Sequence, residues 1–212
     1  MTNPASPDLG RMYRHARERV AALVNGDIDV DRLVPATPEW RVRDVVAHLS
    51  GIADDVANGN MAGAPGDEWT AAQVARGRGR AVAELIADWT KYSPTLEGIL
   101  SGPAGDVAAN AVVDAYAHEA DVRHALGLPL DTDREFLAWA AGRLRDLFAA
   151  SVLEAGLPPV ALALTDAEWF RARLGRRSES QVRAYDWPVD PTPYLDTFFI
   201  FGRADQPLAE VQ

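Results

Sequence analysis

The spacing of apolar residues predicts helices through most of the first 155 residues of this 212-residue chain. Apolar side chains recur at intervals of three and four, which places them on one face of a helix that packs against others. The pattern predicts helices at about residues 6–25, 42–57, 67–100, 110–127 and 133–155. We therefore expect a helical bundle in this part of the chain.

Polar and turn-forming residues mark where several of these helices should begin and end. Ser6-Pro7-Asp8 is a typical helix start and Asn25-Gly26 a typical stop. Asp106 is expected to cap the helix that follows it, and Gly127 is expected to end that helix. Pro94 is expected to kink or interrupt the third helix, because proline lacks an amide hydrogen.

The pattern changes after Gly156. The runs VALALTD and EWFRARLG have strand character and could form a hairpin, and the apolar segment Tyr194–Phe201 is expected to be helical. These features predict a mainly α protein with a small α+β part. We place the expected domain boundary at residue 156, between a bundle of residues 1–156 and an α+β domain of residues 157–212. About 56 residues is close to the lower limit for independent folding, so the second domain should pack on the bundle.

Composition narrows the classes of function. The chain has no cysteine, which excludes disulfides, thiolate metal sites and a cysteine nucleophile, so any thiol chemistry must use a thiol from a small molecule. A net charge of −10 argues against nucleic acid as a partner. No run of apolar residues is long enough to span a membrane, and the N-terminus shows no signal-peptide core. We expect a soluble cytoplasmic protein, either a monomer or a homodimer.

The helix in NAVVDAYAHEADVRHALG carries the strongest chemical signal. Asp114 and His118 are four residues apart, so they project from one helix face, and Asp121 follows on that face. An acid and an imidazole at this spacing can bind one cation together, although such a pair is also common on solvated helices. Glu119 and His124 lie on other faces and are interpreted as surface or rim residues.

A third ligand for such a cation must come from another helix. His48 lies at the border of the apolar stripe in the second predicted helix, beside Leu49. A lone histidine in this setting is more often a hydrogen-bonded core residue, but next to Asp114 and His118 it supplies the missing group. Trp40, just before this helix, is expected to anchor the preceding loop on the bundle.

Three stretches of the chain resemble one known family. TPEWRVRDVVAHLSG is similar to the second-helix motif of the DinB-like, mycothiol-dependent maleylpyruvate isomerases, whose metal-binding domain is a four-helix bundle. DAYAHEADVRHALGLP resembles the second motif of that family, in the same order along the chain. RRSESQVRAYDWPVDPTPYLDTFFIFG resembles the C-terminal tail of one branch.

The resemblance implies a divalent metal, usually zinc, bound by His48, Asp114 and His118. Position 114 departs from the common pattern, in which a glutamate stands there. The resemblance also implies mycothiol, a low-molecular-weight thiol, as cofactor and a small electrophile as substrate. It further implies a contributing C-terminal arginine, for which Arg203 is the nearest match and Arg176 or Arg177 the alternatives.

These observations favour a metal-dependent, mycothiol-dependent thiol transferase or isomerase. Two histidines and one carboxylate leave an open position on zinc, which is typical of a catalytic site. Asp121 could orient an imidazole from behind, or could be a solvated carboxylate that pairs with Arg123 or Arg17. Two other functions stay open: a non-catalytic metal- or ligand-binding or regulatory module, and a metal-dependent hydrolase in which water is the nucleophile.

Overall fold

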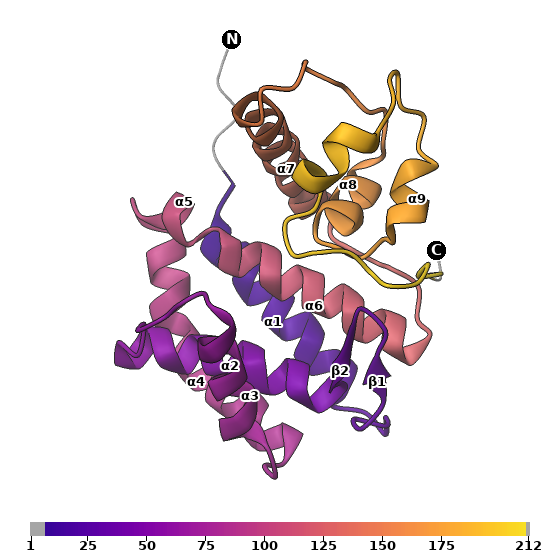
Figure 1. The fold of residues 1–212 in the computed structure, drawn as a ribbon. Coiled ribbons are helices and arrows are strands. Elements are labelled where there is room, and N and C mark those ends of the chain that lie inside the picture. The colour runs from indigo at the N-terminus through magenta and orange to yellow at the C-terminus, as the bar shows by residue number, and fades with distance from the viewer. Residues whose placement is uncertain (1–6, 211–212) are drawn as a thin grey trace. The chain divides into compact units, whose positions relative to one another are not determined.

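The computed structural model describes residues 7–210 and divides into two compact units, Met1–Pro129 and Leu130–Gln212 (Figure 1). The predicted mainly α class is confirmed, since most of the described residues are helical and the only sheet among them has two strands. None of the helices within residues 7–210 is long and apolar enough to cross a membrane.

Four long helices form a bundle in the first unit, and shorter elements surround it. The helix α1 packs against α4 and α6, and α2 packs against the same two helices. The bundle helices are α1 (Leu9–Val24), α2 (Val42–Asn58), α4 (Val82–Leu100) and α6 (Asn110–Leu126). The shorter elements are the antiparallel strands β1 (Leu33–Val34) and β2 (Thr37–Arg41), α3 (Asp67–Gly77) against α2, and α5 (Gly105–Ala108).

Most helix ends of the bundle fall where the sequence predicts them. Asp8 caps α1 by accepting a hydrogen bond from the Arg11 amide over 3.0 Å, while Ser6 lies outside the described residues. Asn25 is the C-cap of α1. Gly127 ends α6 with a φ of 70°, a left-handed conformation that glycine adopts without steric cost.

The predicted continuity of the third helix and the predicted cap of the central helix are wrong. The single helix expected from residue 67 to 100 is two helices, α3 and α4, and the break lies near Gly79, whose φ is 79°. Pro94 lies inside α4 without ending it; Pro94 and Thr90 are exposed, so water can hydrate the Thr90 carbonyl that proline leaves without a donor. Asp106 lies within the short α5, and Ala109 occupies the N-cap position of α6.

The second unit contains helices where a hairpin was expected. Its elements are α7 (Arg134–Glu154), α8 (Asp166–Arg173), α9 (Glu179–Arg183), the 3-10 turn η1 (Thr192–Tyr194) and α10 (Leu195–Phe198). The predicted hairpin is wrong because Thr165 starts a helix: its hydroxyl accepts a hydrogen bond from the Glu168 amide over 3.2 Å. Among residues 130–210 the only strand-like pairing is an isolated bridge between Ser178 and Ala204.

The helix α7 shares its core with the C-terminal elements. Phe148 lies 5.8 Å from Trp169 and 5.4 Å from Phe198, measured between ring centroids, and Val152 belongs to the same buried cluster. The compact units therefore divide before α7, at residues 129 and 130, whereas the sequence placed the boundary after it, at residue 156. The apolar stripe of α7 shows that it packs on something but does not show on what.

This division predicts how two fragments should behave. We expect residues 1–129 to fold as a monomer, because their four bundle helices pack on one another. Residues 1–156 should bind a hydrophobic dye and self-associate, because α7 then exposes Phe148 and Val152 without the partners they have in the full chain. Size-exclusion chromatography and dye fluorescence of both fragments test this. A monomeric 1–156 fragment with no dye binding would contradict it.

Candidate metal centre

Three side chains predicted as ligands converge between α2 and α6. His48 comes from α2, while Asp114 and His118 lie one turn apart on α6, and their ligand atoms all lie within 4.8 Å of one another. Asp114 Oδ2 is 3.3 Å from His48 Nε2, and Asp114 Oδ1 is 3.5 Å from His118 Nε2. The carboxylate therefore lies between the two imidazoles, with both Nε2 atoms facing it.

Burial differs within this triad. The two histidines are 5% and 6% exposed, whereas the Asp114 side chain is 34% exposed. The imidazole rings meet edge to face with centroids 5.3 Å apart. The triad is thus enclosed by protein on the histidine side, while the Asp114 side chain is partly exposed and its Oδ2 atom, beside His48, is buried.

The donor set fits a divalent metal. A tetrahedral ion with bonds of about 2.1 Å to nitrogen and oxygen separates its ligand atoms by about 3.4 Å. The two carboxylate–imidazole distances, 3.3 Å from Oδ2 and 3.5 Å from Oδ1, are each close to this spacing, and one atom from each residue lies within 4.8 Å of the others. Imidazole nitrogens and carboxylate oxygens suit zinc, and three protein ligands leave room for a further one.

Trp40 covers the two histidines from β2. Its ring is stacked on His118 with centroids 5.6 Å apart and lies 5.2 Å from the His48 ring. The prediction that Trp40 anchors the loop on the bundle is consistent with these contacts, which place it on the candidate ligands themselves. The hairpin of β1 and β2 thereby brings an aromatic wall to the site.

Each histidine also has a polar neighbour behind its ring. His48 Nδ1 is 2.8 Å from Gln73 Oε1, and His118 Nδ1 is 3.2 Å from Asp121 Oδ2. Asp121 is fully buried, so it is not the solvated carboxylate of the alternative interpretation. In both histidines the Nδ1 side is occupied by an oxygen of the protein, while Nε2 faces Asp114.

Glu119 differs from its predicted place on the helix surface. It is fully buried, and its Oε1 accepts hydrogen bonds from Arg19 over 2.9 Å and from Arg123 over 2.5 Å. The prediction that Glu119 lies at the surface or rim is therefore wrong. Its spacing along the helix places it away from the core stripe, but Arg19 and Arg123 compensate its charge and allow it to be buried. His124 is half-buried on the same helix and lies outside the triad.

Tyr13 of α1 is a neutral phenol near this site. Burial raises the pKa of Tyr13 well above its ordinary value; the hydrogen bond from Trp89 opposes this rise and the Asp114 carboxylate adds to it. The hydroxyl accepts that hydrogen bond from Trp89 Nε1 over 2.8 Å. Tyr13 therefore stays protonated at neutral pH and does not act as a phenolate base.

Part of the first unit matches a known protein family. Residues 13–102 match the model of the mycothiol maleylpyruvate isomerase N-terminal domain. This segment, less than half of the chain, is similar to that family. No curated protein and no solved structure matches the chain significantly. The family segment contains Trp40, His48 and Gln73, whereas Asp114 and His118 follow it in the sequence and join it in space on α6.

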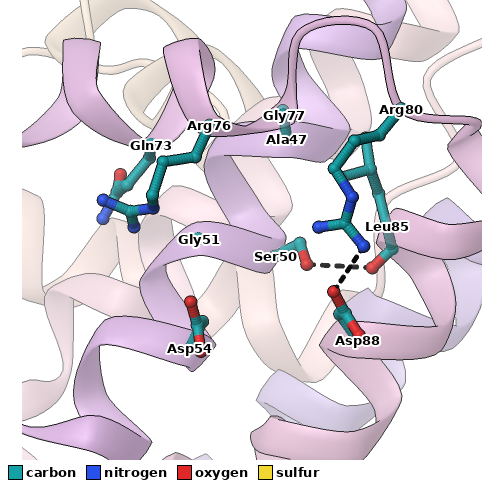
Figure 2. Close-up of a pocket in the computed structure, with 10 residues that line it drawn as sticks. All are labelled: Ala47, Ser50, Gly51, Asp54, Gln73, Arg76, Gly77, Arg80, Leu85 and Asp88. Atoms are coloured by element: carbon teal, nitrogen blue, oxygen red, sulfur yellow. Dashed lines mark hydrogen bonds and ion pairs between the residues drawn. The ribbon is translucent and has the colours of Figure 1, made fainter.

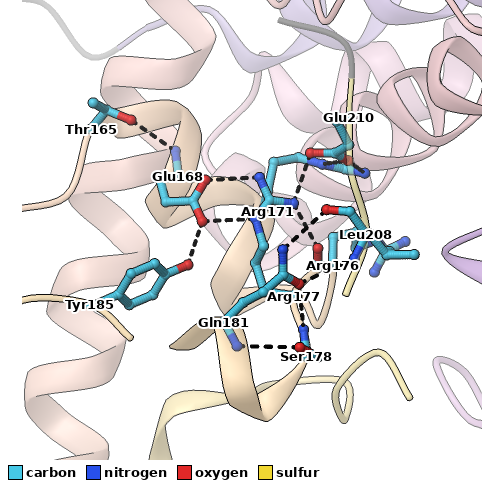
Figure 3. Close-up of polar contacts among 10 residues, drawn as sticks. All are labelled: Thr165, Glu168, Arg171, Arg176, Arg177, Ser178, Gln181, Tyr185, Leu208 and Glu210. Carbon is cyan, nitrogen blue, oxygen red and sulfur yellow. Dashed lines mark hydrogen bonds and ion pairs between the residues drawn. The ribbon is translucent and has the colours of Figure 1, made fainter. Parts of the chain in front are cut away.

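The arginines proposed by the resemblance to the mycothiol maleylpyruvate isomerase family all lie in the second unit. Arg203 is half-exposed, and its Nη1 pairs with Glu179 Oε2 over 2.5 Å. Arg177 is largely buried and bonds both Glu168 and Glu210 over 2.8 Å (Figure 3). Arg176 donates to the Leu174 carbonyl over 2.5 Å. Arg176 and Arg177 therefore serve the packing of this unit, and Arg203 has the most accessible guanidinium of the three.

Sequence reasoning missed two residues that support His48. Gln73 and Asp55 form a buried chain of hydrogen bonds behind the His48 ring. Asp55 lies seven residues after His48, two turns along the same face of α2, and that spacing could have identified it. Nothing in the pattern around Gln73 distinguishes it from an ordinary polar residue of α3.

Proposed function

We propose that this protein is a metal-dependent enzyme that uses mycothiol in the transfer or isomerisation of a small electrophilic metabolite. The observation that carries the proposal is the convergence of His48, Asp114 and His118 within 4.8 Å, next to a segment of the mycothiol maleylpyruvate isomerase family. The family points to the thiol, and the geometry points to the place where a thiol would be activated.

His48 and His118 would hold the metal through Nε2, and Asp114 would hold it through a carboxylate oxygen. We propose zinc as the ion. A bound divalent metal with an open position would favour the ionised form of an incoming thiol, which is the nucleophilic form. The chain supplies no thiol of its own, since it contains no cysteine.

The protein's own side chains prepare this place before any ligand arrives. Trp40 keeps water from the flat face of His118, against which it is stacked. Asp121 Oδ2 lies 3.2 Å from His118 Nδ1 and would favour a hydrogen on that nitrogen, which leaves Nε2 to bind the metal. The partly exposed side of Asp114 would be the side from which the thiol and the electrophile approach.

Arg203 is the proposed contribution of the second unit. Glu179 holds its guanidinium, which also lies over the Phe199 ring at 5.9 Å. A half-exposed arginine held in this way can bind an anionic group of a small substrate. Because arginine stays charged throughout the physiological range, this role requires no proton transfer.

The proposal predicts that mycothiol binds the zinc-loaded protein and not the metal-free protein. Binding should release about one proton at neutral pH, because a free thiol is mostly protonated there and the bound one is not. Calorimetric titration in buffers of different ionisation enthalpy measures that proton. Mycothiol disulfide, which has no free thiol, is the matched control and should not bind in the same way. Zinc-loaded protein that does not bind mycothiol would contradict the proposal and favour a metal-binding module or a hydrolase.

A further inference from the structure

A chain of buried hydrogen bonds runs from the surface of α3 to the back of His48. Arg76 Nη2 donates to Asp55 Oδ1 over 2.7 Å, Gln73 Nε2 donates to Asp55 Oδ2 over 2.9 Å, and Gln73 Oε1 lies 2.8 Å from His48 Nδ1. Gln73 is 1% exposed and Asp55 is fully buried, while the Arg76 side chain is half-exposed. These hydrogen bonds thus connect the solvent-facing guanidinium of Arg76 to His48, a candidate metal ligand.

The direction of the Gln73 amide follows from its partners. A carboxylate can only accept hydrogen bonds, so the NH₂ group of Gln73 must face Asp55 and the amide oxygen must face His48. That oxygen is also only an acceptor, so His48 Nδ1 must carry a hydrogen. Nε2 faces the Asp114 carboxylate, which is likewise only an acceptor, so Nε2 is the nitrogen that gives up its hydrogen when a cation binds between the two groups.

The packing of α2 against α3 fixes Gln73 in this position. A β-carbon added at Gly51 would lie 2.6 Å from Gln73 Cβ, and one added at Gly77 would lie 2.3 Å from Ala47 Cβ. The two helices can approach this closely only because glycine stands at both places. Gln73 and Arg76 also line a pocket of about 100 Å³ together with residues of α2 (Figure 2).

We propose that Gln73, held by Asp55 and Arg76, is a positioning residue that fixes the tautomer of His48 and thereby presents Nε2 to the metal. The inference rests on the proposed function for its metal, but the hydrogen bond between His48 Nδ1 and Gln73 is already present without metal. Supporting partners of this kind typically change metal affinity by about 10–100-fold when they are removed.

The test uses the full-length protein and two measurements. In the wild type, ¹⁵N NMR of the four histidines should show His48 Nδ1 carrying a hydrogen both without metal and with zinc bound. Gln73→Met keeps the volume of the side chain but loses both hydrogen bonds, so His48 should become a mixture of tautomers. The zinc dissociation constant, measured by competition with a chromophoric chelator, should rise about 10–100-fold in this variant. Asp55→Asn should also mix the tautomers, because an amide at position 55 lets Gln73 turn around.

Ser50→Ala is the matched control. Ser50 lies two residues from His48, lines the same pocket, and loses a buried hydrogen bond to the Leu85 carbonyl without touching the chain behind His48. This variant should leave the hydrogen on His48 Nδ1. Its zinc dissociation constant should change by no more than about twofold, well below the 10–100-fold effect of losing a supporting partner. A Gln73→Met protein with an unchanged tautomer and unchanged zinc affinity would overturn the inference. A changed tautomer in a protein whose wild type binds no zinc would uphold the positioning role and refute the proposed metal function.

Discussion

Replacing His118 with alanine is expected to leave the purified protein with almost no bound metal. The candidate site has three protein ligands, one atom from each residue, and these atoms lie within 4.8 Å of one another. Loss of His118 therefore removes one of the three. Loss of a supporting partner behind a ligand already lowers metal affinity about 10–100-fold, so loss of the ligand itself should lower it further. Elemental analysis and a chelator competition measure this, with wild type expected near one metal per chain. His48→Ala should behave in the same way.

His124→Ala is the control for this prediction. His124 is on the same helix, is half-buried, and lies outside the triad, so its loss should leave the metal content unchanged. Asp114→Asn should weaken binding strongly by removing the anionic ligand, while Asp114→Glu should retain the metal because the carboxylate remains. Wild-type metal content in both the His48→Ala and the His118→Ala protein would refute the assignment.

The helices of the bundle could be predicted because their signals are local. The α2 stripe of Val45, Val46 and Leu49 and the glycine end of α6 each involve residues a few positions apart, and the structure confirms both helices. The break at Gly79 and the start of α8 at Thr165 also have local signals, namely a glycine and a capping residue. The prediction followed the continuous apolar runs instead, and so gave one long helix across Gly79 and a hairpin at Thr165.

The partners of a helix are harder to predict than the helix. The apolar stripe of α7 indicates burial but does not distinguish the bundle from Trp169 and Phe198. The same limit applies to the site. The i, i+4 spacing of Asp114 and His118 identifies a pair on one face, whereas the approach of Gln73 to His48 depends on two helices that meet at Gly51 and Gly77. Such contacts arise from three-dimensional packing and leave no periodic pattern.

The second large effect is expected in the C-terminal unit, where Glu210 holds two buried arginines (Figure 3). Its Oε1 accepts a hydrogen bond from Arg171 Nε over 2.8 Å, its Oε2 accepts one from Arg177 Nη1 over 2.8 Å, and its side chain is 2% exposed. Removing one partner of a buried ion pair costs about 3–5 kcal/mol, because the remaining charge stays buried without compensation. Arg177 keeps its ion pair with Glu168 in a Glu210→Gln protein, so this variant should destabilise the unit by less than that full cost, about 2 kcal/mol at pH 7.

The closest control is Glu179→Gln, which also removes a carboxylate bound by two arginines. Glu179 pairs with Arg183 and Arg203, but these contacts are exposed, so the loss of stability should be much smaller. Urea denaturation, followed by hydrogen exchange in α8 and α9, measures both variants within the full chain. An equal decrease in the free energy of unfolding in both variants would show that burial does not make the Glu210 ion pairs more stabilising than the exposed pairs of Glu179.

The difference between wild type and Glu210→Gln should also depend on pH. Burial would raise the pKa of Glu210, but Arg171 and Arg177 outweigh it and hold that pKa below its ordinary value. A carboxylate whose pKa is lower in the folded state binds fewer protons there, so it stabilises the folded state at high pH. The stabilisation should be complete above the ordinary glutamate pKa of about 4.3 and should vanish as the pH falls through the lower folded-state value. A stability difference between the two proteins that stays constant from pH 7 to below that value would mean that the two buried arginines do not depend on the Glu210 charge.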